Sequence, residues 1–304
     1  MPQIFVLYGG VGPEREVSLR SGKSVLDCLG NREGVVGIEV TEASLPDGMN
    51  PKKGVVFPAL HGEFGEDGKL QKLLEDADFD YVGSDSDSSS VCMDKALSKA
   101  RAAEMGVPGA KGLVFSKSDI PTAREIVEKL GPRVVIKPVD SGSSAFLSIV
   151  NGLAELEECL SSLTERRWLF ETYIEGRELS VGVLNGSAMG IVEIIPDGGV
   201  YDYTHKYTSG KTVYRAPAVL SSSEESSIRN SAEAVFTACG CRDFARVDFR
   251  LGESGPVFLE INSLPGLTSE SLLPKSASCR GLSFEDLVLE MVSPALDRFQ
   301  LRET

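Results

Sequence analysis

The stretch FARVDFRLGESGPVFLEIN, residues 244–262, carries the strongest signal for the fold of this chain. Its two ends are apolar runs rich in Val, Phe, Leu and Ile. The segment 252–256 between them holds the Gly and Pro residues that are typical of a turn. The sequence therefore predicts a β-hairpin here.

Four polar side chains stand among the apolar ones in the runs 244–249 and 257–262. Side chains alternate between the two faces of a strand, so Arg246 and Asp248 share a face. By the same rule Glu260 and Asn262 share a face. If the two faces coincide, Asp248, Glu260 and Asn262 form an oxygen cluster suited to Mg²⁺ held together with substrate phosphates. The alternative is a hairpin with solvent-facing charges, but polar groups flanked by apolar residues are costly to bury without a purpose.

Length and composition are those of an ordinary globular enzyme. The chain has 304 residues, of which 41% are hydrophobic and 25% charged, and this length suffices for more than one domain. With 31 basic and 45 acidic residues the net charge is −14, which argues against nucleic acid or an anionic membrane as the main partner. No apolar run approaches the roughly 18 residues that span a bilayer.

The cysteines and the first residues indicate a cellular compartment. The six Cys include no pair with C-x-x-C spacing, and only two His are present, so a zinc site is not expected. Reduced thiols are then the default, and no basic segment or cleavage site precedes the first predicted strand. We therefore expect a cytoplasmic protein.

The first segment has the pattern of an α/β unit. An apolar strand at 4–8 leads into a glycine-rich turn and a helix predicted from about 16 to 29 and closed by Gly30. Such a turn and helix start form a site for an anion or small ligand, although the full dinucleotide fingerprint is missing. A second buried strand, 54–60, ends at His61, in a loop of the kind where ligands bind. His61 is either a ligand-binding or a structural histidine.

The middle of the chain holds a lysine in an unusual setting. The polar stretch 83–90 is either a linker or a capped helix start, and we place a domain boundary there. Lys137 lies inside a β-branched run, where a lysine is expected to reach a phosphate or carboxylate. The loop 140–144 that follows could wrap a phosphate with its N–H groups but is no Walker A sequence. The other predicted elements are helices near 95–105 and 121–130 and strands at 133–139, 168–174 and 179–184.

A series of short motifs runs through nearly the whole chain. They are Leu7-Tyr8-Gly9-Gly10, Glu14-Arg15-Glu16-Val17-Ser18, Ala59-Leu60-His61-Gly62, Gly65-Glu66-Asp67-Gly68, Met93-Asp94-Lys95, Ile136-Lys137-Pro138, Gly142-Ser143-Ser144, Tyr201-Asp202-Tyr203, Lys206-Tyr207, Arg246-Val247-Asp248, Glu260-Ile261-Asn262 and Pro265-Gly266-Leu267-Thr268. Any one of these motifs is weak, but the ordered set is specific. In this order the chain resembles the D-alanine–D-alanine ligase family of the ATP-grasp superfamily.

The resemblance implies a fold and a chemistry. The fold is α/β (α+β overall) with three domains: an N-terminal Rossmann-like, pre-ATP-grasp domain at 1–86, a central nucleotide-binding domain at 87–178 and a C-terminal catalytic and metal-binding domain at 179–304. In the reaction, ATP phosphorylates the carboxylate of one D-alanine, and the amine of a second attacks the acyl phosphate. Loss of phosphate leaves D-alanyl-D-alanine for peptidoglycan precursors of the cell wall. The protein mainly positions the reactants and neutralises charge.

The resemblance also implies which residues meet ATP and metal. Asp248, Glu260 and Asn262 would hold two Mg²⁺ (or Mn²⁺) ions. Glu171 and Glu178 would hold the adenine and ribose, although as isolated sequence features they could equally be surface carboxylates. The remaining residues implied to bind the nucleotide are Lys95, Lys137, Ser143, Ser144 and Lys206.

Further residues are implied to meet the amino acids and the developing charge. Arg246 and the N–H of Gly266 would stabilise the oxyanion. Glu14, Ser143 and Tyr207 would form a hydrogen-bonded set that locks a loop, roughly 201–217, over the site and keeps water from the acyl phosphate. The residues implied to bind the substrates are Glu14 for the first ammonium group, His61, and Ser271 with Leu272 for the second carboxylate.

One position departs from the family pattern. After Gly142-Ser143-Ser144 the family usually has a hydrophobic residue and then glycine, which lets a backbone approach phosphate closely, but this chain has Ala145 and Phe146. We expect Phe146 to seek burial and to occlude the nucleotide pocket until ATP orders the loop. The alternative is that Phe146 folds outward.

Two other functions stay open at this point. One is a related ATP-grasp ligase whose second substrate is a hydroxy acid or another amino acid, and the other is a nucleotide-binding homologue without catalysis. In the family, the position of Tyr207 is linked to dipeptide rather than depsipeptide formation. The expected partners are D-alanine and ATP, and the family suggests a homodimer.

Overall fold

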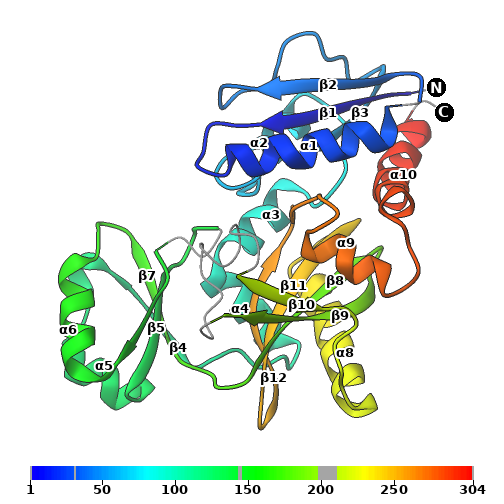
Figure 1. Ribbon diagram of the computed structural model, residues 1–304. Helices are drawn as coiled ribbons and strands as arrows, with labels where there is room; N and C mark the ends of the chain where they lie inside the picture. Colours follow the sequence, from blue (N-terminus) through cyan, green and yellow to red (C-terminus); the bar gives the residue numbers. More distant parts are fainter. Residues whose placement is uncertain (1, 31, 143–145, 198–210, 303–304) are drawn as a thin grey trace.

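A computed structural model of the chain describes residues 2–30, 32–142, 146–197 and 211–302, which fold into three sheets with helices around them (Figure 1). The predicted α/β (α+β overall) class is confirmed. Within these residues no helix combines the length and the apolar character needed to cross a membrane.

The first sheet is parallel, in the order β2-β1-β3, and consists of β1 (Gln3–Gly9), β2 (Val35–Val40) and β3 (Gly54–Pro58). Helix α1 (Arg15–Leu29) packs so closely on this sheet that a Cβ at Gly22 would lie 2.2 Å from Cβ of Tyr8, which only glycine avoids. Helix α2 (Lys69–Asp76) follows β3. The predicted first strand, glycine turn and helix are confirmed, whereas β2 is half-exposed with an internal glycine and gives no clear strand pattern.

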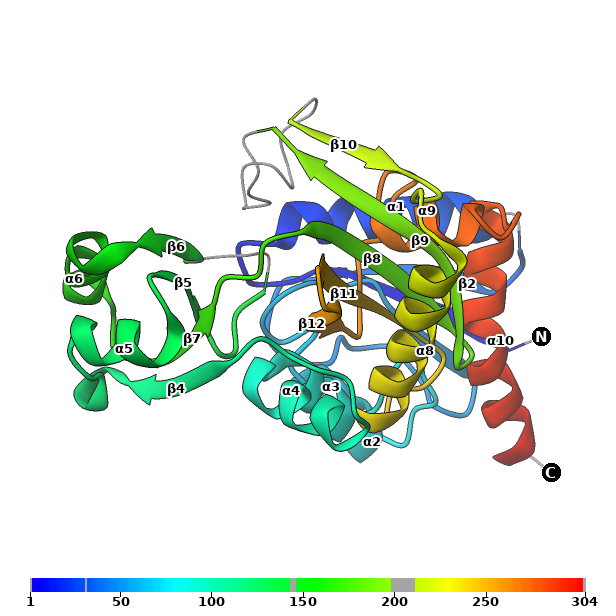
Figure 2. The ribbon, with the colours of Figure 1, turned by 90° about the horizontal axis from the view of Figure 1, so that it is seen from below.

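The second sheet is antiparallel, in the order β4-β7-β5-β6. Its strands are β4 (Gly112–Ser116), β5 (Arg133–Pro138), β6 (Ser148–Asn151) and β7 (Arg167–Thr172). Helices α5 (Ala123–Leu130) and α6 (Gly152–Ser162) share one apolar core with it, and the short 3-10 helix η1 (Lys117–Asp119) lies between β4 and α5. Figure 2 shows this unit standing to one side of the rest of the molecule.

The third sheet, in the order β10-β9-β8-β11-β12, is antiparallel throughout. Its strands are β8 (Arg177–Leu184), β9 (Ser187–Pro196), β10 (Thr212–Arg215), β11 (Phe244–Gly252) and β12 (Gly255–Asn262). Helices α3 (Ser86–Met93), α4 (Lys95–Glu104) and α8 (Ser222–Ala238) share a core with it, and α9 (Leu272–Ser278) contacts β8 and β9. The predicted hairpin is confirmed as β11 and β12.

The stretch 83–90 is a capped helix start and not a linker. Asp85 accepts a hydrogen bond from the N–H of Ser88 at 2.8 Å and caps α3. Helices α3 and α4 pack on the third sheet, although they precede the second sheet in the sequence. The domain boundaries at 86 and 178 stay predictions.

The last helix, α10 (Phe284–Arg302), completes the core of the first sheet. One apolar cluster joins Ile4 and Phe57 of that sheet with Val288 and Met291 of α10. Arg298 of α10 also reaches the start of β11, where its guanidinium donates two hydrogen bonds, at 2.9 and 2.8 Å, to the buried carboxylate of Asp243. The first sheet and the end of the chain therefore form one packed unit.

Candidate active site

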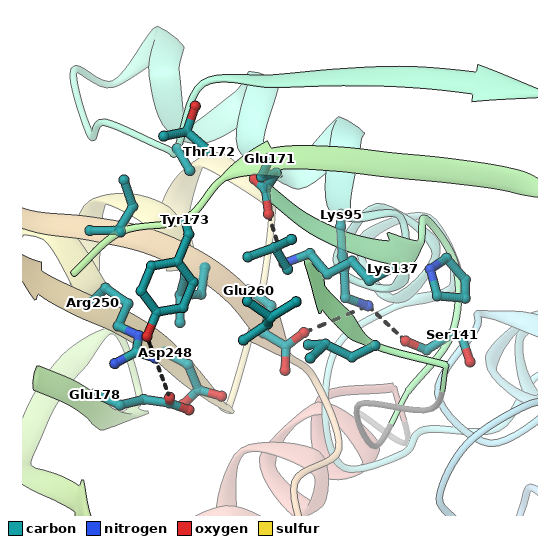
Figure 3. Close-up of a pocket in the computed structure, with 17 residues that line it drawn as sticks. Lys95, Lys137, Ser141, Glu171, Thr172, Tyr173, Glu178, Asp248, Arg250 and Glu260 are labelled. Atoms are coloured by element: carbon teal, nitrogen blue, oxygen red, sulfur yellow. Dashed lines mark hydrogen bonds and ion pairs between the residues drawn. The ribbon is translucent and has the colours of Figure 1, made fainter. Parts of the chain in front are cut away.

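A cleft of about 900 Å³, counted with the solvent space it opens to, lies between the second and third sheets (Figure 3). The second sheet contributes Val135 and Lys137 of β5 and Glu171 of β7. The other walls carry Lys95 of α4, Glu178 of β8, Asp248 and Arg250 of β11, and Leu259 and Glu260 of β12. Apolar walls with a few convergent charged groups are typical of a ligand site.

The register of the hairpin brings the acidic residues together. Asp248 stands directly opposite Glu260, and Arg246 directly opposite Asn262, because β11 and β12 pair antiparallel with these residues as Cα partners. Directly opposed side chains in an antiparallel pair lie on the same face. The condition that the sequence left open, that the two polar faces coincide, is therefore met.

Asp248 is fixed by two neighbours. The guanidinium of Arg246 donates to its carboxylate at 2.8 Å through Nη2, and the hydroxyl of Ser180 donates to Oδ1 at 2.6 Å. Asn262 accepts a hydrogen bond from the N–H of Leu264 at 3.0 Å through Oδ1. Among the described residues no three His, Cys, Asp or Glu side chains gather as a metal cage. A cation here would depend on Asp248, Glu260 and Asn262 together with oxygens of a substrate, as is usual for Mg²⁺.

Lys95 links the acidic pair to the loop after β5. Asp94 caps α4 by accepting hydrogen bonds from the N–H groups of residues 96 and 97, which sets Lys95 as the first residue of the helix. Its ammonium lies 3.6 Å from Oε2 of Glu260 and donates to the carbonyl of Ser141 at 2.7 Å. The buried ammonium therefore contacts Ser141, near the start of the phosphate loop predicted at 140–144.

Glu171 is buried between two lysines. Its Oε2 lies 2.8 Å from Nζ of Lys137 and its Oε1 lies 2.8 Å from Nζ of Lys99. Burial alone would raise the pKa of Glu171, but the two ammonium groups outweigh it and hold the pKa below its ordinary value. Burial works in the opposite sense on Lys137, and the charges of Glu171 and Glu260 leave the pKa of Lys137 above its ordinary value. Glu171 is thus held as a carboxylate.

The far end of the cleft holds an ion pair between a carboxylate and a guanidinium group. Glu178 lies 3.7 Å from the guanidinium of Arg250, which also donates to the hydroxyl of Tyr173 at 3.2 Å. Glu178 and Arg250 face each other as partners in the register of β8 and β11. The carboxylate lines the cleft and is not on a free surface.

The residues expected to bind the amino acids come from two parts of the chain. Glu14 precedes α1 at the first sheet, and Ser271 and Leu272 follow the hairpin at the start of α9. Glu14 is buried just before α1, where a Cβ at Gly62 would lie 2.4 Å from its Oε2. Ser271 precedes α9, and its hydroxyl lies 3.0 Å from the place where a Cβ at Gly266 would stand. Leu272 packs its side chain into the core, so only its backbone can meet a carboxylate.

His61 has partners at both ring nitrogens. Nε2 lies 2.8 Å from the hydroxyl of Ser21, and Nδ1 lies 3.0 Å from the carbonyl of Leu264 and 3.2 Å from Glu66. The same Ser21 hydroxyl accepts a hydrogen bond from the N–H of Leu267 at 3.1 Å. These contacts support the structural alternative, in which His61 ties the loop that carries Gly266 to the first sheet.

Comparison with known proteins agrees with this geometry. The family model described as "D-ala D-ala ligase C-terminus" matches residues 102–293, and the one described as "D-ala D-ala ligase N-terminus" matches residues 32–84. A D-alanine–D-alanine ligase of Syntrophotalea carbinolica is 39% identical over 302 residues, covering 96% of each chain. One of Aquifex aeolicus is 39% identical over 296 residues, covering 94% of this chain and 98% of the other. The chain belongs to the D-alanine–D-alanine ligase family.

Solved structures of family members have the same fold. The D-alanine–D-alanine ligase from Bacillus anthracis complexed with ATP superposes with a TM-score of 0.85 at 28% identity, covering 99% of this chain and all of the other. The VanG D-Ala:D-Ser ligase from Enterococcus faecalis superposes with a TM-score of 0.85 at 29% identity, covering 97% of this chain and 99% of the other. The predicted ATP-grasp fold is confirmed.

Four of the residues assigned from the D-alanine–D-alanine ligase family lie outside the described residues: Ser143, Ser144, Lys206 and Tyr207. Of the predicted loop 201–217, residues 212–215 form β10, which pairs with β9. The expectation that Phe146 is buried in the nucleotide pocket is wrong. The residue is 65% exposed, does not line the cleft, and has Arg166 5.0 Å from its ring centroid. Its φ of 60° lies in the left-handed region, and the exposed ring agrees with the alternative, in which Phe146 folds outward.

Three polar residues of the site were missed by the sequence analysis. Lys99 lies one helical turn after Lys95, and this spacing could have indicated that both lysines lie on the same side of α4. Ser180 pairs with Asp248 across β8 and β11, and Arg250 follows Asp248 on the same face of β11. Strand alternation predicts that Arg250 lies on the same face as Asp248. The contact of Ser180 with Asp248 could not be predicted in this way, because it depends on pairing between strands far apart in the sequence.

Proposed function

We propose that the protein is an ATP-dependent ligase that joins two D-alanines to D-alanyl-D-alanine, a building block of peptidoglycan. One observation carries this proposal: Asp248 and Glu260 stand opposite each other on the hairpin, within a cleft that also holds Lys95 and Lys137. Two carboxylates and two ammonium groups around one space fit a nucleotide triphosphate with its divalent cation. Membership of the D-alanine–D-alanine ligase family supports the substrates.

ATP fits the charges along the cleft. The ammonium groups of Lys95 and Lys137 would face the phosphates, and Glu178 the hydroxyl groups of the ribose. Each carboxylate oxygen of Glu171 has one ammonium at 2.8 Å, Lys137 at Oε2 and Lys99 at Oε1, and an ionised carboxylate can accept further hydrogen bonds beside these. The amino group of adenine is a donor that the Glu171 carboxylate can accept from in addition.

A divalent cation fits the residues on the hairpin. Asp248, Glu260 and Asn262 offer only oxygen ligands, which suit Mg²⁺ or Mn²⁺. When bound, such ions neutralise the phosphate oxygens and make the terminal phosphoryl group easier to transfer. Lys95, 3.6 Å from Glu260, would share the same phosphate charge.

The protein groups then act mainly by position. Glu14 would hold the ammonium of the first D-alanine, and Ser271 with the backbone of Leu272 the carboxylate of the second. The amine of the second attacks the acyl phosphate, the new C–N bond forms, and the C–O bond to phosphate breaks. Arg246 and the N–H of Gly266 would face the oxyanion between these two steps. Arg246 lies beside Asp248, and His61 and Ser21 hold the loop of Gly266 in place.

The remaining assignments belong to the same proposal. Ser143, Ser144 and Lys206 would contact the phosphates, and Tyr207 would help close the site over the amine. Cytoplasmic location and a homodimer are also proposed, on the grounds of free cysteines and of the family resemblance.

The experiment measures product and substrate choice together. The purified protein is given ATP, Mg²⁺ and D-alanine, and ADP, phosphate and dipeptide are quantified. We expect one ADP per dipeptide, and a preference for D-alanine over D-serine and D-lactate as the second substrate. ADP release that needs D-alanine but yields mainly D-alanyl-D-serine or D-alanyl-D-lactate would replace the proposal by the alternative ligase. Failure to use ATP at all would remove the catalytic proposal.

A pair of lysine variants locates the reaction in this cleft. Lys137→Met removes a buried ammonium from the cleft and should lower turnover at subsaturating ATP by at least about tenfold. Lys129→Met removes an exposed lysine from the nearby helix α5 and serves as the matched control. Equal activity of the two variants would show that the nucleotide binds elsewhere.

A further inference from the structure

Lys99 is a buried lysine that the proposed reaction does not use. It projects from α4, and its ammonium makes two polar contacts: it lies 2.8 Å from Oε1 of Glu171 and donates to the carbonyl of Phe258 at 2.9 Å. The same nitrogen lies 5.5 Å from the ring centroid of Phe258. The side chain of Lys99 is only 11% exposed, so this charge has been taken almost entirely out of water.

Keeping that charge buried is unfavourable. Burial and the nearby ammonium of Lys137 lower the pKa of Lys99, and the charges of Glu171 and Glu260 and the hydrogen bond to Glu171 only partly oppose them. Neutralising Glu171 would need one cation, and Lys137 already supplies it at 2.8 Å. A second ammonium on the other carboxylate oxygen adds direction, because it fixes the plane of the carboxylate between two points.

The anchors of the two lysines lie on different elements. Lys137 belongs to the second sheet, as Glu171 does, but Lys99 belongs to α4 and is tied to β12 through the carbonyl of Phe258. The N–H of Phe258 in turn donates to the carbonyl of Pro108 at 2.8 Å, in the segment that leads into the second sheet. Lys99 therefore holds the orientation of Glu171 relative to the wall of the cleft formed by the third sheet.

We propose that Lys99 is a positioning residue that aims Glu171 at the exocyclic amino group of the purine and so makes the site select adenine over 6-oxopurine nucleotides. This inference rests on the proposed function. Glu171 lines the cleft, and an ionised carboxylate can accept about four hydrogen bonds, so with one lysine on each oxygen it can still accept from an amino group. A 6-oxo group would instead place an acceptor against a buried carboxylate, which is unfavourable.

The test compares ATP with ITP, which carries oxygen in place of the amino group. We measure kcat/KM for both nucleotides, with saturating D-alanine, in the wild type and in Lys99→Met. The ratio of ATP to ITP should fall by about tenfold or more in the variant, mainly through the KM for ATP. Arg101→Met, which removes an exposed cation from the same helix, is the matched control and should leave the ratio unchanged.

A second variant and a cycle separate positioning from folding. Lys99→Gln keeps a donor but loses the charge, so its ratio should lie between those of the wild type and Lys99→Met; it also replaces Lys99→Met if that variant does not fold. In a Glu171→Gln background, Lys99→Met should change the ratio no further, because Lys99 acts through Glu171. A wild-type ratio in the folded Lys99 variants, or an undiminished effect without Glu171, would overturn the inference. A wild type that does not use ATP would instead overturn the proposed function.

Discussion

The ion pair between Arg298 and Asp243 should be one of the strongest single supports of the fold. The Asp243 side chain is 3% exposed and accepts from both terminal nitrogens of Arg298, at 2.9 and 2.8 Å, and from the N–H of Gly83 at 2.8 Å. Arg298→Met would leave a buried carboxylate with a backbone N–H as its remaining described partner. Removing one partner of a buried pair typically costs about 3–5 kcal/mol. Because the Arg298 side chain is 29% exposed and water can partly replace it, we expect about 3 kcal/mol.

The measurement is urea unfolding followed by far-ultraviolet circular dichroism, since the single Trp168 would report only on the second sheet. Arg101→Met is the control: its side chain is 50% exposed and its partner Glu104, at 3.8 Å, is 68% exposed, so the loss should stay within about 1 kcal/mol. Adding Asp243→Asn to Arg298→Met should recover part of the loss, because asparagine tolerates the left-handed φ of 59° and carries no charge. A cost for Arg298→Met no larger than that of the control would refute the reasoning.

Three further predictions concern the metal, the phosphate loop and pH. Glu260→Gln should lower Mg²⁺-dependent turnover at least about a hundredfold, whereas Glu253→Gln at the exposed tip of the hairpin should not; near-normal turnover at saturating Mg²⁺ would remove Glu260 from the metal site. Phe146→Gly should leave the KM for ATP within about twofold of the wild-type value, because the ring is exposed and does not line the cleft. A several-fold decrease of this KM in steady-state assays would instead support the hypothesis that Phe146 occludes the nucleotide pocket. Hydrogen bonds from Arg177 hold the pKa of Glu193 below its ordinary 4.5, so their contribution to stability is complete above that pH and is lost as the pH falls through the lower folded value. Glu193→Gln should therefore flatten the acid side of a stability–pH curve measured by urea unfolding, and an unchanged slope would contradict this.

The hairpin could be predicted because its turn residues and apolar strands are local signals, but the pairing of its two acidic residues could not. Counted back from the turn without interruption, Asp248 would stand opposite Leu259, but a register shift between Asp248 and Phe249 places it opposite Glu260, and residue spacing does not reveal this shift. The contact of Lys99 with Glu171 could not be predicted either, since it joins α4 to β7 across a long stretch of chain. Only the packing of the two elements brings these charges together.

The prediction that Phe146 is buried was wrong for a different reason. Apolar side chains seek burial on average, but the direction of one side chain in a loop is set by its backbone. Phe146 has a left-handed φ, and its exposed ring has Arg166 beside it. Residue types alone determine neither this φ nor this contact.

The shared core of the first sheet and α10 has a consequence for synthesis on the ribosome. Chains are made from the N-terminus, and N-terminal units usually fold first. Here β1 and β3 emerge early, but Val288 and Met291, which close their core, are among the last residues to be made. Until then α1 covers only part of this apolar face of the first sheet, so the nascent chain should remain a substrate for chaperones until translation is nearly complete.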